Sequence, residues 1–265
     1  STVHNEVLDL GNLEFMQHNV VINSLTPLRS AVGHPWYSYY VLKTEGIFQS
    51  QEEIDNFTWR DPETGIKQKV QPNAKPGDFK YVDFNNDGKI TDDDKQYLGS
   101  YMPKITFGFG GNLQWKGNDL SFQFQGVGKS TVYNGFKQMG YTGRGQGGNM
   151  LADVKNSWEY NKTSGVPRIG LISDPNGNYN SLNDFFLEDA SYLRLKNVTI
   201  GYTLPDNVMR AIGLPGSTAR FYLNGENLFT ATDYSGIDPE VGNFGIDGGT
   251  YPVARSFSIG FNFSF

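Results

Sequence analysis

The segment 83–94 is the part of the chain whose residue types and spacing point most directly to chemistry. It reads DFNNDGKITDDD and places side-chain oxygens at its first, third, fifth and last positions. These oxygens belong to Asp83, Asn85, Asp87 and Asp94. Such spacing lets alternate side chains converge on a hard cation, Gly88 permits the sharp turn, and the carbonyl of Lys89 adds a ligand. The spacing predicts a calcium loop of the EF-hand type.

Two features limit what this loop is expected to do. Asp94 stands where such loops usually carry glutamate, and its shorter side chain coordinates less fully, as in the dockerin loops that the segment resembles. Pro76 and Gly77 precede the segment, so no flanking helix is predicted. We therefore expect a calcium clip that stabilises a long loop, and not a sensor that opens. A solvated acidic turn is the alternative.

No group of residues has a spacing that predicts catalysis. The three histidines, His4, His18 and His34, lie near the N-terminus and have no nucleophile arranged with them. Glu52 and Glu53 are adjacent, which is not a spacing that defines the carboxylate pair of a hydrolase. Cysteine is absent, which excludes disulfides and cysteine-based sites. An enzyme is not predicted.

The composition excludes several classes of partner and segment. The formal net charge is −6 with no basic run, so no nucleic-acid partner is expected. No segment approaches the roughly 18 consecutive apolar residues of a transmembrane helix. The N-terminal segment lacks the charged start and apolar run of a signal peptide. Aromatic residues make up 14% of the chain and glycines number 32, which favours strands with rings on one face and small residues on the other.

The final stretch, 253–265, alternates with a period of two. Its odd positions are large or apolar except Arg255, and its even positions are small or polar. Such alternation places one kind of side chain on each face of a strand. The length suits a tilted membrane-spanning strand of about 9–11 residues. An edge strand of a soluble sandwich has the same pattern.

Other segments repeat this pattern. Segments 105–115 and 120–125 alternate on either side of the turn-forming tetrad 116–119, which predicts a hairpin with one apolar and one polar face. Further strands are expected at 36–43 and 219–226.

The segment 193–204 changes phase near Lys196 and Asn197, which indicates a β-bulge. A short helical turn is expected to follow at 205–214, capped by Asp206 and ended by Gly213.

The connections between these strands are sorted by length. The long ones span 45–103, 129–189 and 230–251, and the short ones span 116–119 and 205–215. Outer-membrane barrels have short periplasmic turns and longer extracellular loops, whereas a soluble sandwich has no reason to sort its loops. The strands number about six, fewer than the roughly eight of the smallest bacterial single-chain barrels. The pattern predicts the C-terminal part of a larger barrel, with the long connections outside the cell.

Blocks in order along nearly the whole chain carry a resemblance to a known family. They read LKTEGIFQSQEEID at 42–55, KPGDFKYVDFNNDGKITDDDKQYLG at 75–99, PKITFGFGGNL at 103–113, DASYLRLKNVTIGYTLP at 189–205, RFYLNGENLFTATDYSGIDPEV at 220–241 and FSIGFNFSF at 257–265. Together they resemble the C-terminal region of SusC/RagA-type TonB-dependent outer-membrane transporters.

The resemblance implies an all-β fold, the C-terminal strands of an antiparallel transmembrane β-barrel of about 22 strands with long extracellular loops. Residues 1–265 would form this part, with the plug and N-terminal strands outside the chain. The stretch 45–103 would be an extracellular loop that carries the metal loop 83–94. The location implied is the outer membrane of a Gram-negative bacterium, as a multi-pass barrel in contact with its lipid.

The resemblance also implies partners and cargo. A SusD-like surface lipoprotein would lie as a lid on the extracellular loops, and TonB would supply energy through the missing plug. Imported nutrients in the family are oligosaccharides, hence glycan import, or peptides. The residues that contact substrate remain unknown. Several loop aromatics are expected to be packing anchors: Tyr133, Phe136, Tyr141, Trp158 and Tyr160.

A soluble, calcium-stabilised β-sandwich that binds carbohydrate is the alternative, because it shares the alternation, the aromatic residues and the metal loop. The two hypotheses differ in what the apolar faces touch. In a barrel the odd row of 253–265 faces lipid, with Arg255 near the outer headgroups, and the even row faces the lumen. Phe265 resembles the terminal signal by which such barrels are recognised for insertion.

Overall fold

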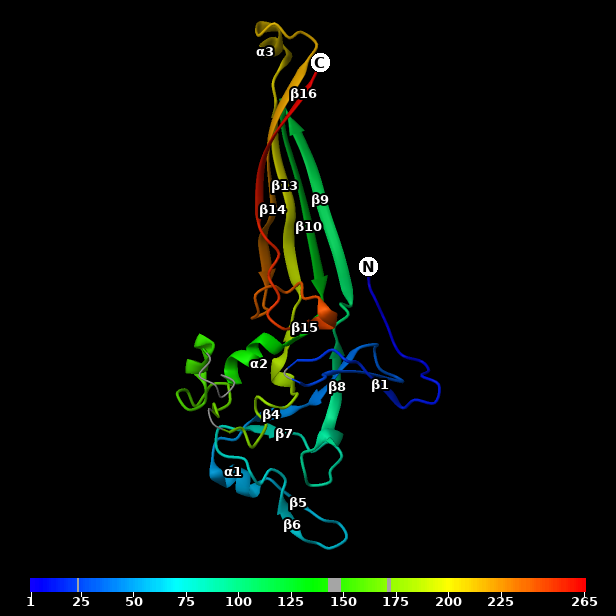
Figure 1. Ribbon diagram of the computed structural model, residues 1–265, viewed down its shortest axis with the longest axis vertical. Helices are drawn as coiled ribbons and strands as arrows, with labels where there is room; N and C mark the ends of the chain where they lie inside the picture. The colour runs from blue at the N-terminus through cyan, green and yellow to red at the C-terminus, as the bar shows by residue number, and fades with distance from the viewer. Residues whose placement is uncertain (23, 143–148, 171–172) are drawn as a thin grey trace.

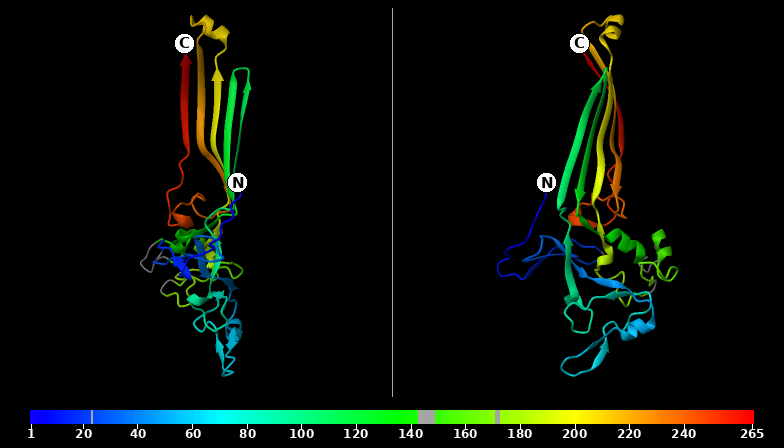
Figure 2. Two further views of the ribbon diagram at one scale, coloured as in Figure 1. Left: turned by 90° about the vertical axis from the view of Figure 1, so that its right-hand side faces the viewer. Right: turned by 180° about the vertical axis from the view of Figure 1, so that it is seen from behind.

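The computed structural model describes residues 1–22, 24–142, 149–170 and 173–265, and it has two parts. One is a long antiparallel sheet, and the other is a folded body built from the connections between its strands (Figure 1). Figure 2 shows the sheet as a single layer. Its five strands lie in the order β16-β14-β13-β10-β9. They are β9 (Ile105–Trp115), β10 (Asn118–Gly128), β13 (Tyr192–Thr203), β14 (Thr218–Thr232) and β16 (Ser256–Ser264).

The predicted hairpin is confirmed as β9 and β10, which pair along their whole lengths. Lys116 and Gly117 join them with φ angles of 48° and 83°. Positive φ at both positions is the mark of a type I′ turn, whose twist matches that of the strands it connects. This turn lies at the end of the sheet far from the body (Figure 1).

The predicted helical turn is α3 (Asp206–Ala211), at the same end of the sheet. Gly213 follows it with φ 82°, as expected of a residue that ends a helix. The expectation that Asp206 caps the helix is wrong, because Pro205 occupies the N-cap position and makes no side-chain cap. Asp206 is the first helical residue, where its charge still favours the positive end of the helix dipole.

The predicted bulge is also confirmed. The pairing of β13 with β14 shifts register between Leu195 and Asn197. Against β10, residue 196 is the extra residue of β13, so Leu195 lies opposite Phe124 while Val198 lies opposite Phe122. Apolar side chains of opposite sequence phase therefore stay on one face of the sheet.

The long connections come together at the other end of the sheet, as their sorting by length predicts (Figure 1). A four-stranded sheet there contains β1 (Phe15–Gln17), β2 (Leu28–Ala31), β3 (Ser38–Leu42) and β8 (Lys95–Ser100). A three-stranded sheet contains β12 (Leu187–Asp189), β11 (Thr131–Asn134) and β15 (Ile246–Asp247). Two small pairs are β4 (Thr44–Ile47) with β7 (Phe79–Tyr81), and β5 (Thr58–Arg60) with β6 (Lys67–Lys69). The helical elements are α1 (Gln51–Asn56), α2 (Gly135–Thr142), η1 (Asp92–Asp94), η3 (Ala152–Asn156), η4 (Asp184–Phe186) and η5 (Asn243–Gly245).

One tyrosine shows that these connections form a single body. The buried hydroxyl of Tyr39 lies within hydrogen-bond distance of two carbonyl oxygens, those of Thr131 at 3.0 Å and Gly245 at 2.9 Å, and shares its one proton between them. These three residues come from the three long stretches of chain outside the sheet. The principal core surrounds Tyr39 and includes Leu28, Val41, Tyr133, Tyr141, Phe186 and Ile246. Residues 143–148 and 171–172 of the stretch 129–189 lie outside the described part of the chain.

The expectation that 36–43 is a strand of the long sheet is wrong. Its strand, β3, is short and pairs with β2 and β8 inside the body. Tyr39 and Val41 are fully buried there, so the aromatic run serves a packed core. The final strand also begins later than expected, at Ser256. Among the described residues, no helix has the length and apolar character needed to cross a membrane.

Candidate functional site

The apolar face of the long sheet is the most unusual surface of the molecule. Strand register places the rings and aliphatic side chains of all five strands on this one face. Its exposed members include Phe107, Phe109, Leu113, Trp115, Ile200, Phe221, Leu223, Phe257, Ile259 and Phe261. In the described part of the chain no second sheet packs on it, which contradicts the sandwich alternative. A surface of this kind needs an apolar partner of large area.

The opposite face of the same sheet is polar and internally bonded. Arg220 holds Asp119 through two hydrogen bonds, Nε to Oδ1 at 2.9 Å and Nη2 to Oδ2 at 2.6 Å. This pair lies over Gly201, where an added Cβ would come within 2.6 Å of both side chains. Asn224 accepts from Asn197 and from Thr199 at 2.9 and 2.8 Å. The two faces therefore suit two different environments.

The acidic loop 83–94 lies in the body and has the turn predicted for it. Gly88 has φ 81°, a conformation that glycine adopts without strain. Asp83 accepts from the backbone N–H groups of Asp87 and Gly88, at 3.1 and 2.9 Å. Asn85 accepts from the N–H of Asp87 at 3.0 Å, and Asp87 accepts from the N–H of Lys89 at 3.0 Å. The loop is folded around its own side-chain oxygens.

Asp94, the last predicted ligand, is fully buried beneath the loop. Its Oδ1 accepts from the N–H of Phe84 at 2.8 Å, and its Oδ2 accepts from the N–H of Thr91 at 2.7 Å. With the Thr91 side chain it forms the capping box of η1. The shorter aspartate thus bonds both to the start and to the end of the loop.

The donor chemistry and the backbone shape fit a hard cation. In the part of the chain that the structure describes, however, no group of three or more acidic or histidine side chains is placed to hold a metal ion. The carboxylates of Asp83, Asp87 and Asp94 accept backbone N–H groups instead. Each carboxylate oxygen has two lone pairs, so these bonds leave capacity for a metal. Binding would require the three carboxylates to converge.

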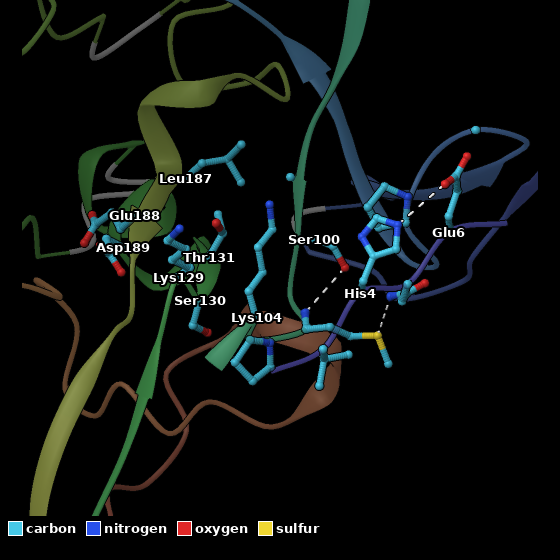
Figure 3. A pocket seen from close by; sticks show the side chains of 17 residues that line it. His4, Glu6, Ser100, Lys104, Lys129, Ser130, Thr131, Leu187, Glu188 and Asp189 are labelled. Atoms are coloured by element: carbon cyan, nitrogen blue, oxygen red, sulfur yellow. Dashed lines mark hydrogen bonds and ion pairs between the residues drawn. The ribbon is translucent and has the colours of Figure 1, made fainter. Parts of the chain in front are cut away.

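A cavity of about 450 Å³ lies where the sheet meets the body (Figure 3). Its walls are the N-terminal residues 3–6, Gly33 and Pro35, the link 99–104 before β9, residues 129–131 after β10, and β12 (Leu187–Asp189). Figure 3 shows the side chain of Lys104 rising into it, with Lys129 beside Thr131. Sequence reasoning missed this site, because its residues are far apart in the chain and form no motif.

The loop aromatics behave as expected of packing anchors where they are buried. Tyr133 and Tyr141 are fully buried in the core of the body. Phe136 and Trp158 are half-buried, and only Tyr160 among the five is largely exposed. None of them lines the cavity.

No family model matches the chain. It is 36% identical to TonB-dependent receptor P26 of Formosa agariphila, over 100% of this chain and 26% of that protein. It is 29% identical to TonB-dependent receptor SusC of Bacteroides thetaiotaomicron, over 75% of this chain and 19% of that protein.

Solved structures of TonB-dependent receptors also align with this chain. The RagAB peptide importer in its closed-closed state aligns with a TM-score of 0.68 and 27% identity, over 97% of this chain and 25% of that chain. The open-open state aligns with a TM-score of 0.67 and 26% identity, over 98% of this chain and 25% of that chain. The chain spans about a quarter of the length of the relatives it matches.

Proposed function

We propose a transport function from one premise, that this chain belongs to the SusC/RagA-type TonB-dependent receptors. It is homologous to them over nearly its whole length, and it matches about a quarter of the length of each. These receptors are outer-membrane transporters and not enzymes. The chain forms part of the wall and the extracellular loops of such an importer. Its five long strands belong to the C-terminal region of a large antiparallel barrel.

The exposed apolar face of the sheet is the observation that carries this proposal. The five strands are 9 to 15 residues long, and a strand that crosses a bilayer needs about 9–11. Apolar side chains face one way and polar side chains the other, as in barrels whose outer face meets lipid. Trp115 and Tyr202 lie at the end of the apolar face next to the short connections, where aromatic girdles mark the bilayer boundary.

The two edges of the sheet support a closed barrel. β16 pairs only with β14, so its outer edge is open within the described residues. The outer edge of β9 is paired at its base, where Thr106 and Ser1 exchange hydrogen bonds and the N–H of Val3 donates to Lys104. Further strands of the receptor would continue this pairing and join the two edges, because open edges do not persist in a membrane.

The sorting of the connections supports an orientation. The body faces the outside of the cell, and α3 with the turn at Lys116–Gly117 faces the periplasm. A SusD-like lipoprotein docks on the body, and TonB acts through the plug elsewhere in the receptor. The cargo is an oligosaccharide or a peptide. The RagAB importer, whose name states a peptide cargo, supports the second.

Labelling of the intact receptor on cells tests this orientation. A small tag inserted after Gly65, in the tip between β5 and β6, is expected to react with an impermeant reagent on intact cells. A tag at Asn118 is expected to react only after the outer membrane is opened. Surface labelling at Asn118 would overturn the orientation, and a receptor absent from the outer membrane would overturn the function.

Calcium in the loop 83–94 is a separate part of the proposal. Asp83, Asn85, Asp87 and Asp94, with the carbonyl of Lys89, would hold the ion, which would neutralise their charge and stiffen the loop. We expect the intact receptor to bind one calcium ion more than its Asp83→Ala/Asp87→Ala variant, by elemental analysis after dialysis against millimolar calcium. Equal calcium content in the two proteins would remove the metal from the proposal.

A further inference from the structure

The cavity at the base of the sheet contains charges of both signs, and among the described residues only the positive ones lack a hydrogen-bond or ion-pair partner. Glu188 accepts from Lys137 at 2.9 Å and from the hydroxyl of Ser235 at 2.8 Å. Asp189 accepts from the N–H of Ser191, and Glu6 lies 3.7 Å from the ring of His4. Each lining carboxylate thus has a described partner, but only Glu188 is paired with a lysine, and Asp189 bonds to a neutral backbone N–H.

Lys104 and Lys129 have no such partner for their ammonium groups in the described part of the chain. Neither ammonium group makes an ion pair or a hydrogen bond with any residue that the structure describes. Figure 3 shows Lys104 directed into the space between Ser100 and Leu187, without any bonded neighbour. The hydroxyls of Ser130 and Thr131 line the same cavity and donate to no described group. All four groups are hydrogen-bond donors.

The backbone at Lys129 strengthens this observation. Its φ is 55°, in the left-handed region that is strained for a residue with a side chain. Glycine would adopt this conformation without that strain. Residues with such a strained backbone are found more often at binding sites, where the surrounding structure holds them in place.

Lys104 continues the sequence phase of the polar row of β9, two residues before Thr106. In the proposed barrel this row faces the lumen, so the cavity opens on the route of the cargo and not on lipid. Its volume is within the range of about 300–1,000 Å³ that small-ligand sites occupy.

We propose that this cavity binds an oxoanion group of the cargo, with Lys104 and Lys129 as the cationic ligands and Ser130 and Thr131 as neutral donors. The site selects acidic cargo, and it rests on the importer function proposed above. A carboxylate of an acidic oligosaccharide and the terminal carboxylate of a peptide both supply this chemistry.

Calorimetric titration of the purified intact receptor in detergent tests the site. The probes are trigalacturonate against neutral galactotriose, and trialanine against its C-terminal amide. We expect one charged probe to bind more tightly than its neutral counterpart. The Lys104→Gln/Lys129→Gln variant is expected to lose about tenfold in affinity for that probe, since each exposed ion pair contributes about twofold to fivefold. The probe that shows the loss identifies the source of the oxoanion.

Two controls make the result specific. Lys67→Gln removes another exposed lysine, in β6, that has no ion-pair partner among the described residues, and this variant should bind as the wild type does. Lys104→Arg/Lys129→Arg keeps both charges and should retain most of the affinity. Wild-type binding of the charged probe should also weaken between about 50 and 500 mM salt.

The proposal is overturned if neither charged probe binds more tightly than its neutral counterpart, or if Lys67→Gln loses as much affinity as the double variant. These binding results are independent of where the receptor lies in the cell. The labelling experiment at Asn118 tests the proposed orientation, so its outcome does not depend on the outcome of the binding experiment.

Discussion

Gly88 is the residue where the acidic loop most needs the absence of a side chain. A Cβ at this position would lie 2.6 Å from Cε3 of Trp59 in the β5–β6 hairpin, and φ is 81°. Gln68 of the same hairpin donates to the Gly88 carbonyl at 3.3 Å. We expect Gly88→Ala to destabilise this contact by about 1–3 kcal/mol, measured as faster protease cleavage within 83–94 of the intact receptor.

Gly65→Ala is the matched control, because Gly65 has φ 68° and nothing lies within 4 Å of an added Cβ. It should show only the backbone strain of about 1 kcal/mol. An equal effect of the two substitutions would mean that packing against Trp59 is unimportant.

Arg194 holds the connection between β14 and β16 against the sheet. It is nearly fully buried and contacts Asp238 at 2.6 Å, Glu240 at 2.9 Å and the hydroxyl of Thr230 at 2.9 Å. Arg194→Gln should destabilise this connection by about 2–4 kcal/mol, because it leaves a buried carboxylate unpaired. Cleavage of 233–255 by protease is the measurement. Lys196→Gln, which removes a more exposed partner of Glu240, should cost less than about 1 kcal/mol.

The same contact has a pH dependence. Burial raises the pKa of Asp238, but the N–H groups of Glu240 and Val253 and the guanidinium of Arg194 outweigh it, so the pKa lies below its ordinary value. A depressed carboxyl pKa contributes stability that is complete above about pH 4 and is lost as pH falls through the folded value. Protease resistance of 233–255 should therefore fall below about pH 4. In Asp238→Asn the resistance should be lower at pH 7 and should change less with acid.

At the scale of elements, β16 offers a direct test of which face meets lipid. Ile259 is 84% exposed on the apolar face, and its neighbour Ser258 lies on the polar face. Ile259→Lys should destabilise the receptor in lipid vesicles by about 2–4 kcal/mol, because a charge near mid-bilayer is costly. Ser258→Lys should cost less than about 1 kcal/mol. Urea unfolding in vesicles measures both, and the reverse order would exchange the two faces.

The hairpin and the bulge show how far element-level prediction reaches. Alternation at 105–115 and the composition of Lys116 and Gly117 are local signals, and the structure confirms them. The phase change near Asn197 is equally local. The prediction that 36–43 joins the long sheet is wrong because alternation and aromatic content do not indicate which sheet a strand joins. Partner choice depends on the preceding strand β2 and on β8, which lies beyond the stretch 45–94 in the chain.

At the scale of the whole molecule, the unpartnered apolar face governs solution behaviour. The isolated chain should aggregate in buffer without detergent, because exposed apolar patches of this extent associate. Light scattering after size-exclusion chromatography, with and without detergent, is the measurement. A monodisperse monomer without detergent would contradict lipid contact.

The sequence alone determined what short-range pattern can encode: period-two strands, the turn at 116–117, the bulge, the sorted connections, the acidic loop and the family resemblance. Their physical basis is local, since side-chain direction alternates within a strand and turn residues set their own φ. The tertiary structure decided what depends on distant segments meeting. It placed β3 in the body, turned the carboxylates of 83–94 toward backbone N–H groups, and brought Lys104 and Lys129 into one cavity. No spacing in the chain signals such meetings, because they arise from packing between connections far apart in sequence.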